Sequence, residues 1–539
     1  RIWRRKRMAR GRLLGRLALG ATAGVGGMAA LASQDEGVRR SLTFWSRALP
    51  IYAHYRWLQY VELPLRGVDL ASAESERRYN ELHERYAPRV EKLALELRGF
   101  YVKGAQIVSM REDILPEAHL RWCKRMQAEV PTPFAPDESR RVVEEALGGA
   151  EAFARTFLHW DDEPLGAASI GVVHRARLAR DGREVAVKVM MPGIERKFRS
   201  DIGTVKRFCQ LAMPQHVSAL DEVEAQFFSE FDYVLEARNM ARVHANLMPT
   251  RWARRVAVPA PLLDLCSHHV LVMELLPGEK LDVGLRSQWK RVAARRGISL
   301  AELEAAERAK PARPLGEGAW VHALALALVR AADVCANLGR LAYNWSAGLA
   351  LGRLPYSWSE LPAPLSSILR LLCEVHAHEL FENGVLNGDP HAGNVLLMPD
   401  GRLGLIDYGQ VKELPLDFRV RYAKLIVALA DGRNAEAVRI ATDEMGLRTR
   451  RNDPEVLWRV LAMQHDRDTD DVTMGLNLQL FMEWAEAQDP MEYTPPDLVL
   501  PGRVTMMMRG FGNAFRLQLS VAKLWREQAV AFLRAQGEL

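Results

Sequence analysis

The sequence predicts an α+β fold, with two strand hairpins among a larger number of helices. The first hairpin spans residues 172–178 and 183–190, on either side of the turn Arg180-Asp181-Gly182. The second joins two apolar runs through the turn-forming tripeptide Pro399-Asp400-Gly401. Elsewhere apolar residues recur at helical spacing, both before the first hairpin and after Gln410.

The chain of 539 residues is long enough for more than one domain, and its net charge of +6 comes from one end. Residues 1–34 carry eight of the 73 Lys and Arg residues and none of the 67 acidic ones, so the remainder is close to neutral. The basic pI is therefore no sign of nucleic-acid binding. Neither zinc-finger spacing nor interleaved aromatic and basic residues support such binding.

The basic terminal stretch has the composition of an organellar targeting segment, because it is rich in Arg, lacks acidic residues and continues into Ala and Gly. Residues 17–34 are uncharged and just long enough to span a bilayer, although Gly and Ala add little apolar area. Three alternatives stay open: a cleaved presequence, a single anchor helix retained after import, and a disordered basic tail.

Helical periodicity covers residues 41–104, 116–127, 137–147, 194–211 and 221–247. The aromatic residues of the first segment are expected to form a packing face. The apolar run 270–276 is expected to be a short buried strand. Five scattered cysteines without Cys-x-x-Cys spacing argue against a disulfide framework or structural zinc, so we expect buried free thiols.

The region after the third strand gives a mixed pattern. A basic patch at Lys290–Arg296 precedes a helix rich in Ala and Glu, and a long apolar stretch follows at residues 323–351. Arg330, Asp333 and Arg340 interrupt that stretch. We therefore expect a helix packed against the rest of the protein rather than a membrane span.

The stretch from Asn387 to Gly409 carries the residues that point to chemistry. Asp389 and Asn394 lie five positions apart, and Asp407 follows the second hairpin. This is the layout of a kinase-type phosphoryl-transfer site, in which one acid lies near the attacking group while an Asn and a second Asp bind magnesium. The hairpin is expected to fold the two metal ligands toward each other, and Mg²⁺ prefers such hard oxygen ligands.

Further parts of an ATP site appear in the order that such a site needs. Lys188, on a predicted strand, would bring positive charge to the phosphates, and Glu230 or Glu236, both expected on one helix, would hold its ammonium. Glu274 and Leu275 end a strand at a hinge, where backbone groups would meet an adenine. The small-residue loop that would drape over the phosphates comprises Gly166, Ala167, Ala168, Ser169, Ile170 and Gly171.

Together these parts predict a protein-kinase-like fold with two lobes, a helical N-terminal extension and a helical C-terminal lobe. The expected divisions are a targeting or membrane-spanning segment at residues 1–40, the extension at 41–150, the N-lobe at 151–280, the C-lobe at 281–430 with a helical insert at 282–365, and a helical C-terminal region at 431–539.

The same residues resemble the motifs of the UbiB/ADCK atypical kinase-like family, the aarF-domain proteins. The family's KxGQ motif is matched by the stretch from Phe100, with Lys103 and Gln106 at the Lys and Gln positions. Its alanine-rich loop appears as GAASIGVVH, its Glu-x-Asp motif as Glu230-Phe231-Asp232, its catalytic loop as NGDPHAGN and its DFG motif as Asp407-Tyr408-Gly409. The resemblance covers residues 41–430.

The resemblance implies an atypical kinase or ATPase that uses Mg²⁺ and ATP. Its catalytic residues would be Asp389 and Lys188, and its metal ligands would be Asn394 and Asp407. Lys103 and Gln106 would reach over the nucleotide. Family members support the metabolism of coenzyme Q and other isoprenoid lipids. The implied partners are therefore a nucleotide, lipid or quinone-pathway proteins and a membrane, but no nucleic acid. The implied location is the mitochondrial inner membrane, with the plastid as the alternative.

Protein kinase activity is not expected. The family's N-terminal extension covers the place where a protein substrate would bind. In addition, only seven residues separate Gly409 from the next expected helix, with no Ala-Pro-Glu among them. We therefore expect no platform for docking a peptide substrate in this part of the chain.

Three positions depart from the family pattern. Gly166 replaces an Ala and adds backbone freedom worth about 0.5–1 kcal/mol. Val172 takes the place of a Gln, and Ala105 takes the place of a Gly. None of these changes removes a metal ligand or the strand lysine, so we expect nucleotide binding to be retained.

Two other functions stay open. NGDPHAGN also resembles the catalytic loop of small-molecule kinases of the aminoglycoside and choline type, and the interval between Glu274 and Asp389 leaves room for a substrate subdomain. The altered phosphate loop also fits a nucleotide-gated binding protein without turnover. The KxGQ-like motif argues against the first alternative, and the complete Asp389, Asn394 and Asp407 set argues against the second.

Overall fold

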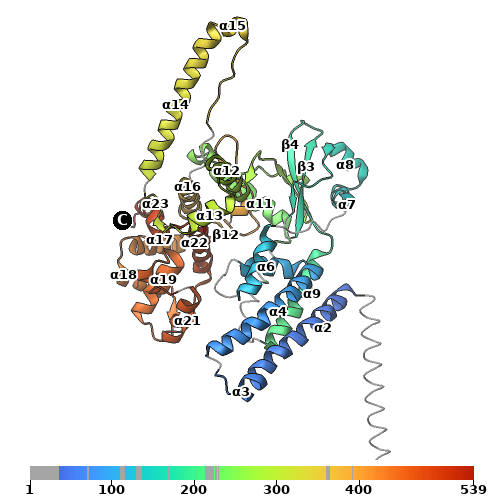
Figure 1. The fold of residues 1–539 in the computed structure, drawn as a ribbon, viewed down its shortest axis with the longest axis vertical. Coiled ribbons are helices and arrows are strands. Elements are labelled where there is room, and N and C mark those ends of the chain that lie inside the picture. Colours follow the sequence, from blue (N-terminus) through green and yellow to red (C-terminus); the bar gives the residue numbers. More distant parts are fainter. Residues whose placement is uncertain are drawn as a thin grey trace, which may run out of the picture. The chain divides into compact units, whose positions relative to one another are not determined.

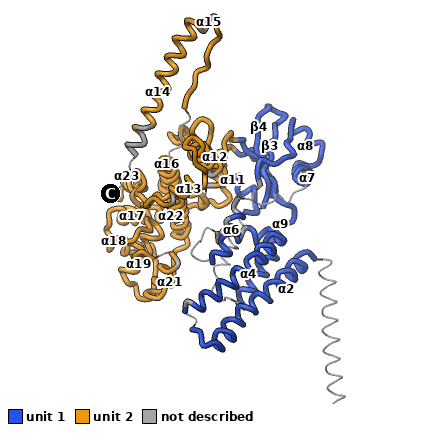
Figure 2. Tube along the Cα trace, in the orientation of Figure 1, with its two compact units in different colours: residues 1–237, 261–275 blue, residues 238–260, 276–539 orange. Residues whose placement is uncertain are grey.

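In the computed structural model the chain forms two compact units (Figure 1, Figure 2). Unit 1 comprises Arg1–Ala237 and Pro261–Leu275, and unit 2 comprises Arg238–Ala260 and Leu276–Leu539. The structure describes residues 35–69, 72–109, 116–128, 136–167, 170–212, 224, 228, 230–317, 319–359, 365–390, 392–476 and 478–539. The expected targeting segment and the choice among its three alternatives lie outside the described residues.

Helices make up the N-terminal half of unit 1, as the periodicity predicts. They are α2 (Glu36–Trp57), α3 (Leu63–Leu65), α4 (Ala73–Leu97), α5 (Phe100–Ser109), α6 (Glu117–Ala128), α7 (Pro136–Leu147), α8 (Ala150–Thr156) and, after the first hairpin, α9 (Ile194–Ala212). Phe44 of α2 is buried, and its ring lies 5.6 Å from that of Tyr101 and 5.5 Å from that of Phe208. The aromatic packing face is thus confirmed, although Trp57 is 57% exposed.

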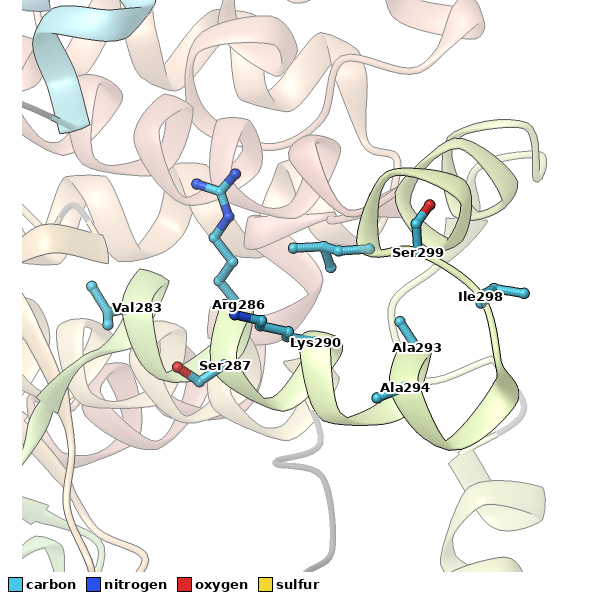
Figure 3. Close-up of a pocket in the computed structure, with 9 residues that line it drawn as sticks. Val283, Arg286, Ser287, Lys290, Ala293, Ala294, Ile298 and Ser299 are labelled. Atoms are coloured by element: carbon cyan, nitrogen blue, oxygen red, sulfur yellow. The ribbon is translucent and has the colours of Figure 1, made fainter.

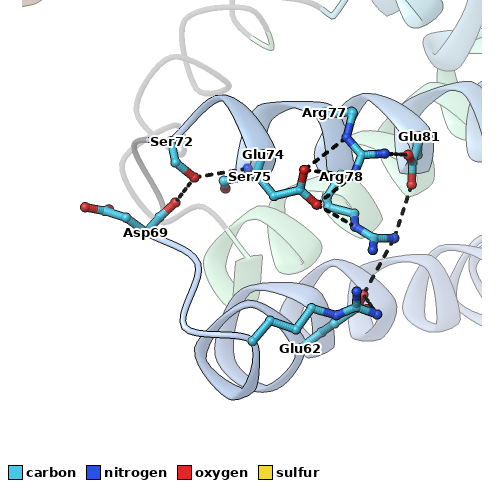
Figure 4. Close-up of polar contacts among 9 residues, drawn as sticks. Glu62, Asp69, Ser72, Glu74, Ser75, Arg77, Arg78 and Glu81 are labelled. Atoms are coloured by element: carbon cyan, nitrogen blue, oxygen red, sulfur yellow. Dashed lines mark hydrogen bonds and ion pairs between the residues drawn. The ribbon is translucent and has the colours of Figure 1, made fainter.

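Polar contacts fix the start of α4 and cover its exposed face (Figure 4). The Ser72 hydroxyl accepts a hydrogen bond from Ser75 N at 3.2 Å and so caps the helix. Arg77 bridges Glu74 and Glu81 with contacts of 2.7 and 2.8 Å. Exposed pairs of this kind contribute only about 0–1 kcal/mol each, so apolar packing rather than charge holds the helix in place.

The sheet of unit 1 is antiparallel in the order β1–β3–β4–β6, with β2 paired to β3. Its strands are β1 (Phe157–Trp160), β2 (Gly166–Ala167), β3 (Gly171–Leu178), β4 (Glu184–Met190) and β6 (Val270–Glu274). β3 and β4 are the first predicted hairpin, and Gly182 in their turn has a φ of +71°, which Gly adopts without strain. Val172, Val187 and Val272 are buried in one cluster with Val143 of α7.

The helix predicted over residues 221–247 is interrupted: residues 224 and 228 are helical, but the helix does not continue through Glu230. α11 spans Tyr233–Leu247, and Glu230 lies in a turn before it. The Asp232 carboxylate accepts hydrogen bonds from the backbone N–H groups two and three residues further on, at 3.0 and 3.1 Å. This cap starts a new helix at that point, so the prediction that Glu230 and Glu236 share a helix is wrong.

Unit 2 is mainly helical, as predicted for the region after Gln410. Its helices are α12 (Leu281–Arg296), α13 (Leu300–Arg308), α14 (Ala319–Trp345), α15 (Gly348–Leu351), α16 (Leu365–His378), α17 (Leu416–Ala430), α18 (Asn434–Arg439), α19 (Pro454–His465), α20 (Asp470–Thr473), α21 (Leu478–Gln488), α22 (Pro496–Ala514) and α23 (Val521–Ala535). Helices α16, α17, α19, α22 and α23 share one apolar core. Within it Trp525 is fully buried and donates its indole N–H to Cys373 O at 2.8 Å.

Short strands of unit 2 hold the stretch that carries the chemistry. β10 (Val395–Leu397) and β11 (Leu403–Leu405) are the second predicted hairpin, and Gly401 in their turn has a φ of +85°. β5 (Val256–Ala257) and β7 (Glu279–Lys280) flank them in one sheet. β9 (Val385–Asn387) pairs with β12 (Val411–Glu413), so the two ends of residues 387–411 lie side by side.

The apolar stretch at residues 323–351 forms α14 and α15, but the prediction that it packs against the rest of the protein is wrong. Leu328, Leu338 and Trp345 are 63%, 58% and 79% exposed. The reason is that the buried side of α14 is polar and is covered by a returning segment, residues 352–359 (Figure 1). Within the part of the chain that the structure describes, no helix is both long and apolar enough to cross a membrane.

The cysteines are free thiols, as expected. Cys123, Cys209 and Cys373 are buried, and burial raises the pKa of the Cys373 thiol to about 12. Cys266 is half-buried, and Cys335 on α14 is exposed. The expectation of burial therefore fails at Cys335, because the helix that carries it turns its apolar side outward.

Candidate nucleotide and metal site

An ion pair in unit 1 joins the strand lysine to α11. Lys188 Nζ lies 2.7 Å from Glu236 Oε1 and 3.0 Å from Glu236 Oε2, and the two side chains are only 11% and 3% exposed. The Nζ also lies 5.0 Å from the centre of the Tyr233 ring, at the start of α11. Of the two glutamates proposed for this role, Glu236 pairs with Lys188, and Glu230 lies in the preceding turn.

The small-residue loop is described in part. Gly166 lies in β2 and pairs with Val173 of β3. Ile170 is 5% exposed, so its side chain belongs to the protein interior and only its backbone can face a ligand. Ala168 and Ser169, together with the side chain of Ala167, lie outside the described residues.

Gly171 begins β3 where the backbone is crowded. A Cβ at this position would lie 2.4 Å from Val189 O and 2.7 Å from the Tyr233 hydroxyl. A larger residue would therefore displace β3 from β4 or push away the ring that lies beside Lys188. The glycine has a packing reason to be present, apart from any role toward phosphates.

Two other expected parts of the site also lie in unit 1. β6 ends at Glu274, which pairs with Val185 of β4 and is exposed. Leu275, the next residue, is half-buried. Lys103 and Gln106 lie three residues apart on α5, a spacing that places both on one face of a helix. Their side chains lie outside what the structure describes.

In unit 2, Asn387 at the end of β9 ties the catalytic loop together. Its Oδ1 accepts a hydrogen bond from Asp389 N at 3.1 Å, and its Nδ2 donates to Asp407 O at 2.9 Å. Asn387 is only 6% exposed. One buried carboxamide therefore links the backbone of the expected acid to the backbone of an expected metal ligand.

The second hairpin brings Asn394 to the same place. Asn394 Nδ2 donates to Asp389 O at 3.2 Å, and Asn394 O accepts from Ile406 N at 3.1 Å. Asp407 follows Ile406 directly, and its Oδ1 accepts from Gly409 N at 3.1 Å. The hairpin thus folds Asn394 and Asp407 toward each other, as their spacing predicts.

The donor set suits magnesium in kind. Asn394 offers a carboxamide oxygen and Asp407 a carboxylate, and both are hard oxygen ligands. Among the described residues, no group of three or more His, Cys, Asp and Glu could hold a metal ion by itself. Mg²⁺ usually takes one or two protein ligands and completes its octahedron with waters and phosphate oxygens, so the residues fit a metal that arrives with a nucleotide.

Two buried residues next to the catalytic loop, Tyr408 and Glu379, carry groups that can lose a proton. Glu379 is the first residue of a π-helical turn (Glu379–Asn383). Burial, together with the charges of Glu379 and Asp407, raises the pKa of the Tyr408 phenol well above its ordinary value. Burial also raises the pKa of Glu379 to about 8, even though Asn387 N lies 3.4 Å from its Oε2. Glu379 Oε1 and the Tyr408 hydroxyl have no hydrogen-bond partner among the described residues.

Two contacts to the loop come from residues that the sequence did not single out. Asn239 Nδ2, on α11, donates to Tyr408 O at 3.1 Å. Arg503, on α22, lies 3.9 Å from Asp389 Oδ1 and donates to Gln410 Oε1 at 2.9 Å. Neither residue carries a signal in the sequence, because each lies on a helix far along the chain from the loop it contacts.

A separate cavity of about 570 Å³ lies along α12 and the start of α13 (Figure 3). Its lining consists of Val283, Arg286, Ser287, Lys290, Ala293, Ala294, Ile298, Ser299 and Leu300. Among the basic side chains of the patch at Lys290–Arg296, Lys290 alone lines the cavity, and none of the residues expected at the nucleotide site does. The cavity therefore adds nothing to the assignment of that site.

Residues 125–299 and 340–441, just over half of the chain, match the family model of the ABC1 atypical kinase-like domain. The chain belongs to this family, and its fold is accordingly kinase-like and α+β. The resemblance to UbiB and aarF-domain proteins is confirmed. The matched ranges contain the sheet of unit 1 and the catalytic loop, whereas residues 300–339, with α13 and the greater part of α14, fall outside them.

Curated relatives agree with the family. The chain is similar to the Probable protein kinase UbiB of Azotobacter vinelandii, with 33% identity over 44% of this chain and 41% of that protein. It is 25% identical to AarF domain-containing protein kinase 1 of Gallus gallus, over 68% of this chain and 57% of that protein. It is 29% identical to the chloroplastic Protein ACTIVITY OF BC1 COMPLEX KINASE 7 of Arabidopsis thaliana, over 35% of this chain and 27% of that protein.

The chain thus spans less than two thirds of the length of each of these relatives. Among solved structures, it is similar to Rv3197 from Mycobacterium tuberculosis, determined as a complex with erythromycin. That likeness has 20% sequence identity and a TM-score of 0.44, and it covers 84% of this chain and 97% of the other.

Proposed function

We propose that this chain is an atypical kinase or ATPase that binds Mg²⁺ and ATP. The observation that supports the proposal most directly is the set of hydrogen bonds through which Asn387 and the second hairpin gather Asp389, Asn394 and Asp407. An acid beside two oxygen ligands for a metal is what phosphoryl transfer from a nucleotide needs, because the chemistry depends on positioning and on neutralising charge.

Each of these residues has a distinct task in the proposed reaction. Asp389 would accept the proton of the attacking hydroxyl or water, and Asn394 and Asp407 would hold the magnesium ion. Bound magnesium would neutralise charge on the phosphates. Lys188, oriented by its ion pair with Glu236, would add a second positive charge to the phosphates.

The remaining parts of the proposed site bind the nucleotide without taking part in the chemistry. The loop from Gly166 to Gly171 would approach the phosphates with backbone N–H groups. The backbone at Glu274 and Leu275 would meet the adenine. Lys103 and Gln106, on the helical extension at residues 41–150, would cover the nucleotide and exclude a protein substrate.

We further propose that the activity serves coenzyme Q or related isoprenoid-lipid metabolism at the mitochondrial inner membrane, or in a plastid. Membership of the ABC1 family supports this role, as do the relatives named UbiB and ACTIVITY OF BC1 COMPLEX KINASE, the latter chloroplastic. The proposed partners are a nucleotide and lipid or quinone-pathway proteins at a membrane. Protein phosphorylation is not part of the proposal.

Binding of ATP tests the metal ligands. Asp407→Asn keeps the shape of the side chain but removes its charge, so we expect Mg²⁺-dependent ATP binding to weaken at least about tenfold. Titration calorimetry with ATP, with and without Mg²⁺, measures the change. Asp400→Asn, in the exposed turn of the same hairpin, is the matched control and should bind as the wild type does. If Asp407→Asn binds ATP as tightly as the wild type does, the assignment of Asp407 as a metal ligand is wrong.

Turnover is tested separately, with Asp389→Ala. We expect the wild type to hydrolyse or transfer the terminal phosphate of ATP and the variant to lose that activity by about 10²-fold or more while it still binds ATP. An inactive wild type that binds ATP would favour the nucleotide-gated binding protein. Fast phosphorylation of a soluble alcohol would favour the small-molecule kinase. A comparison of lipid extracts from wild-type and deletion strains then addresses the lipid substrate.

A further inference from the structure

The arm of unit 2, defined as α14, α15 and the returning segment 352–359, has its polar groups inside and its apolar side chains outside. The segment runs back beside the helix (Figure 1). The family model leaves residues 300–339 unmatched, so most of α14 is a feature beyond the matched domain.

Two buried asparagines of α14 bind the backbone of the returning segment. Asn344 donates to Leu354 O at 2.9 Å and accepts from Leu354 N at 2.7 Å. Asn337 makes the same pair of bonds with Ser357, at 3.0 Å each. Both asparagines are 8% exposed. The returning segment pairs with no strand among the residues that the structure describes, and side chains of the helix satisfy its backbone groups instead.

The third buried polar side chain is Asp333. It accepts hydrogen bonds from Ser359 N at 2.9 Å and from the Ser359 hydroxyl at 2.7 Å, and Arg330 donates to Ser359 O at 3.2 Å. Asp333, Asn337 and Asn344 recur at helical spacing, so they form one polar stripe. A helix of a globular protein normally places an apolar stripe on its buried side, and α14 does the reverse.

Large apolar side chains cover the outside of the arm. On the helix they include Leu324, Leu328, Val329, Val334 and Leu338, and Trp345 near the tip is 79% exposed. At about 100° per residue, the exposed apolar positions occupy roughly two thirds of the circumference of α14. Leu354, Tyr356 and Trp358 of the returning segment are exposed as well, so the arm is apolar on most of its sides.

The width of this apolar surface decides between the possible occupants. A groove on a partner protein contacts a single stripe of a helix, at spacings of three and four residues. Lipid surrounds an inserted element and requires its backbone polar groups to be satisfied internally, which Asn337 and Asn344 do. Residues 319–359 contain three Arg and one Asp, and that Asp is bonded within the arm, so the net charge suits anionic phospholipids. Trp and Tyr side chains favour the membrane interface.

We propose that the arm inserts into the surface of a lipid bilayer that contains anionic phospholipids and so attaches unit 2 to the membrane. The arm enters one leaflet and does not span the bilayer. The proposal stands apart from the nucleotide chemistry, because it rests on the polarity of the arm, and its test needs neither ATP nor turnover.

Cys335 offers a local readout, since it is an exposed free thiol on α14. The full chain is labelled there with an environment-sensitive maleimide dye and mixed with phosphatidylcholine vesicles, with or without phosphatidylglycerol. We expect the dye emission to shift to the blue on vesicles, at lower lipid concentration when phosphatidylglycerol is present. The variant Cys335→Ser, treated identically, should show no shift, which assigns the signal to the arm.

A matched pair of variants tests the apolar surface itself. Leu349 of α15 and Leu158 of β1 are 69% and 68% exposed. Leu349→Glu should raise the lipid concentration needed for the shift by at least about tenfold, whereas Leu158→Glu should behave as the wild type does. If Leu349→Glu fails to fold by circular dichroism, Trp345→Glu takes its place.

Two results would overturn the proposal. One is the absence of a shift in the wild type, or equal shifts in Leu349→Glu and Leu158→Glu. The other is a wild-type dimer in sedimentation velocity without lipid that Leu349→Glu converts to a monomer, because the arm would then be an interface between two copies of the chain. A monomeric wild type whose dye shifts on vesicles supports the proposal.

Discussion

Two regions of unit 2 use buried asparagines on backbone groups and differ in what surrounds them. Asn387 draws the two ends of the catalytic loop together inside the fold, and the polar groups behind that loop are left incompletely satisfied. Asn337 and Asn344 bind the returning segment to α14, and apolar side chains lie on the outside of the arm. Unsatisfied buried polar atoms cost stability, so the buried groups beside the loop lower the stability of the fold. The arm has its polar groups satisfied internally, and among the described residues no apolar partner covers its outer side.

The largest expected effect comes from removing one asparagine in each region. Asn387→Ala leaves two half-buried backbone groups, Asp389 N and Asp407 O, without their partner, and we expect the free energy of unfolding to fall by about 2–4 kcal/mol. Asn337→Ala opens the arm alone and should change the global free energy of unfolding by less than about 1 kcal/mol. Urea denaturation measures both changes.

Hydrogen exchange locates the two effects. Asn337→Ala should speed exchange at residues 352–359 and leave the amides of β9 and β12 protected, while Asn387→Ala should expose those strands. Similar losses of global stability in the two variants would contradict the comparison, because the arm would then be part of the same cooperative core.

The next effect concerns the neutral carboxyl group behind the loop. The pKa of Glu379 is about 8 in the folded chain, against 4.5 ordinarily. Between these values the folded state holds one proton more than the unfolded state, so this group's contribution to stability is complete at low pH and is lost as the pH rises toward about 8. Glu379→Gln cannot titrate. We therefore expect the stability of the wild type relative to Glu379→Gln to fall by about 2–3 kcal/mol between about pH 6 and 8.

Unfolding curves of the two proteins across this pH range measure the difference. Burial lowers the pKa of His376 to about 4, so the contribution of His376 to stability increases as the pH rises. This contribution is the same in both proteins and cancels in the difference between them. A difference that stays constant with pH would show that Glu379 is already ionised in the folded chain.

The proximity of the expected site residues could be predicted from the sequence where it depends on short-range structure. Pro399-Asp400-Gly401 determines a tight hairpin, and that hairpin is enough to bring Asn394 beside Asp407. The helical periodicity misplaces Glu230 because it continues across Asp232, although an Asp followed by an apolar run is a recognisable helix cap.

The long-range features could not be predicted in this way. Arg503 reaches the loop only because α22 packs in the core of unit 2, and no local pattern encodes that packing. The periodicity of α14 predicted a helix correctly. It could not reveal that the polar stripe would be the buried one, because the returning segment that covers the stripe is held by Asn337 and Asn344, side chains that solvated helix faces also carry.

The smallest expected effect on stability concerns two buried tyrosines, one with a hydrogen-bonded hydroxyl and one without. Tyr408 and Tyr422 are both fully buried, but the Tyr422 hydroxyl lies 3.1 Å from His465 Nδ1, whereas that of Tyr408 has no partner among the described residues. Tyr408→Phe should therefore raise the free energy of unfolding by about 0.5–1 kcal/mol, and Tyr422→Phe should lower it by about 1 kcal/mol. Paired thermal and urea melts resolve the opposite signs. A loss of stability in Tyr408→Phe would mean that the hydroxyl has a partner in the folded chain, and the region behind the loop would then be as well satisfied as the arm.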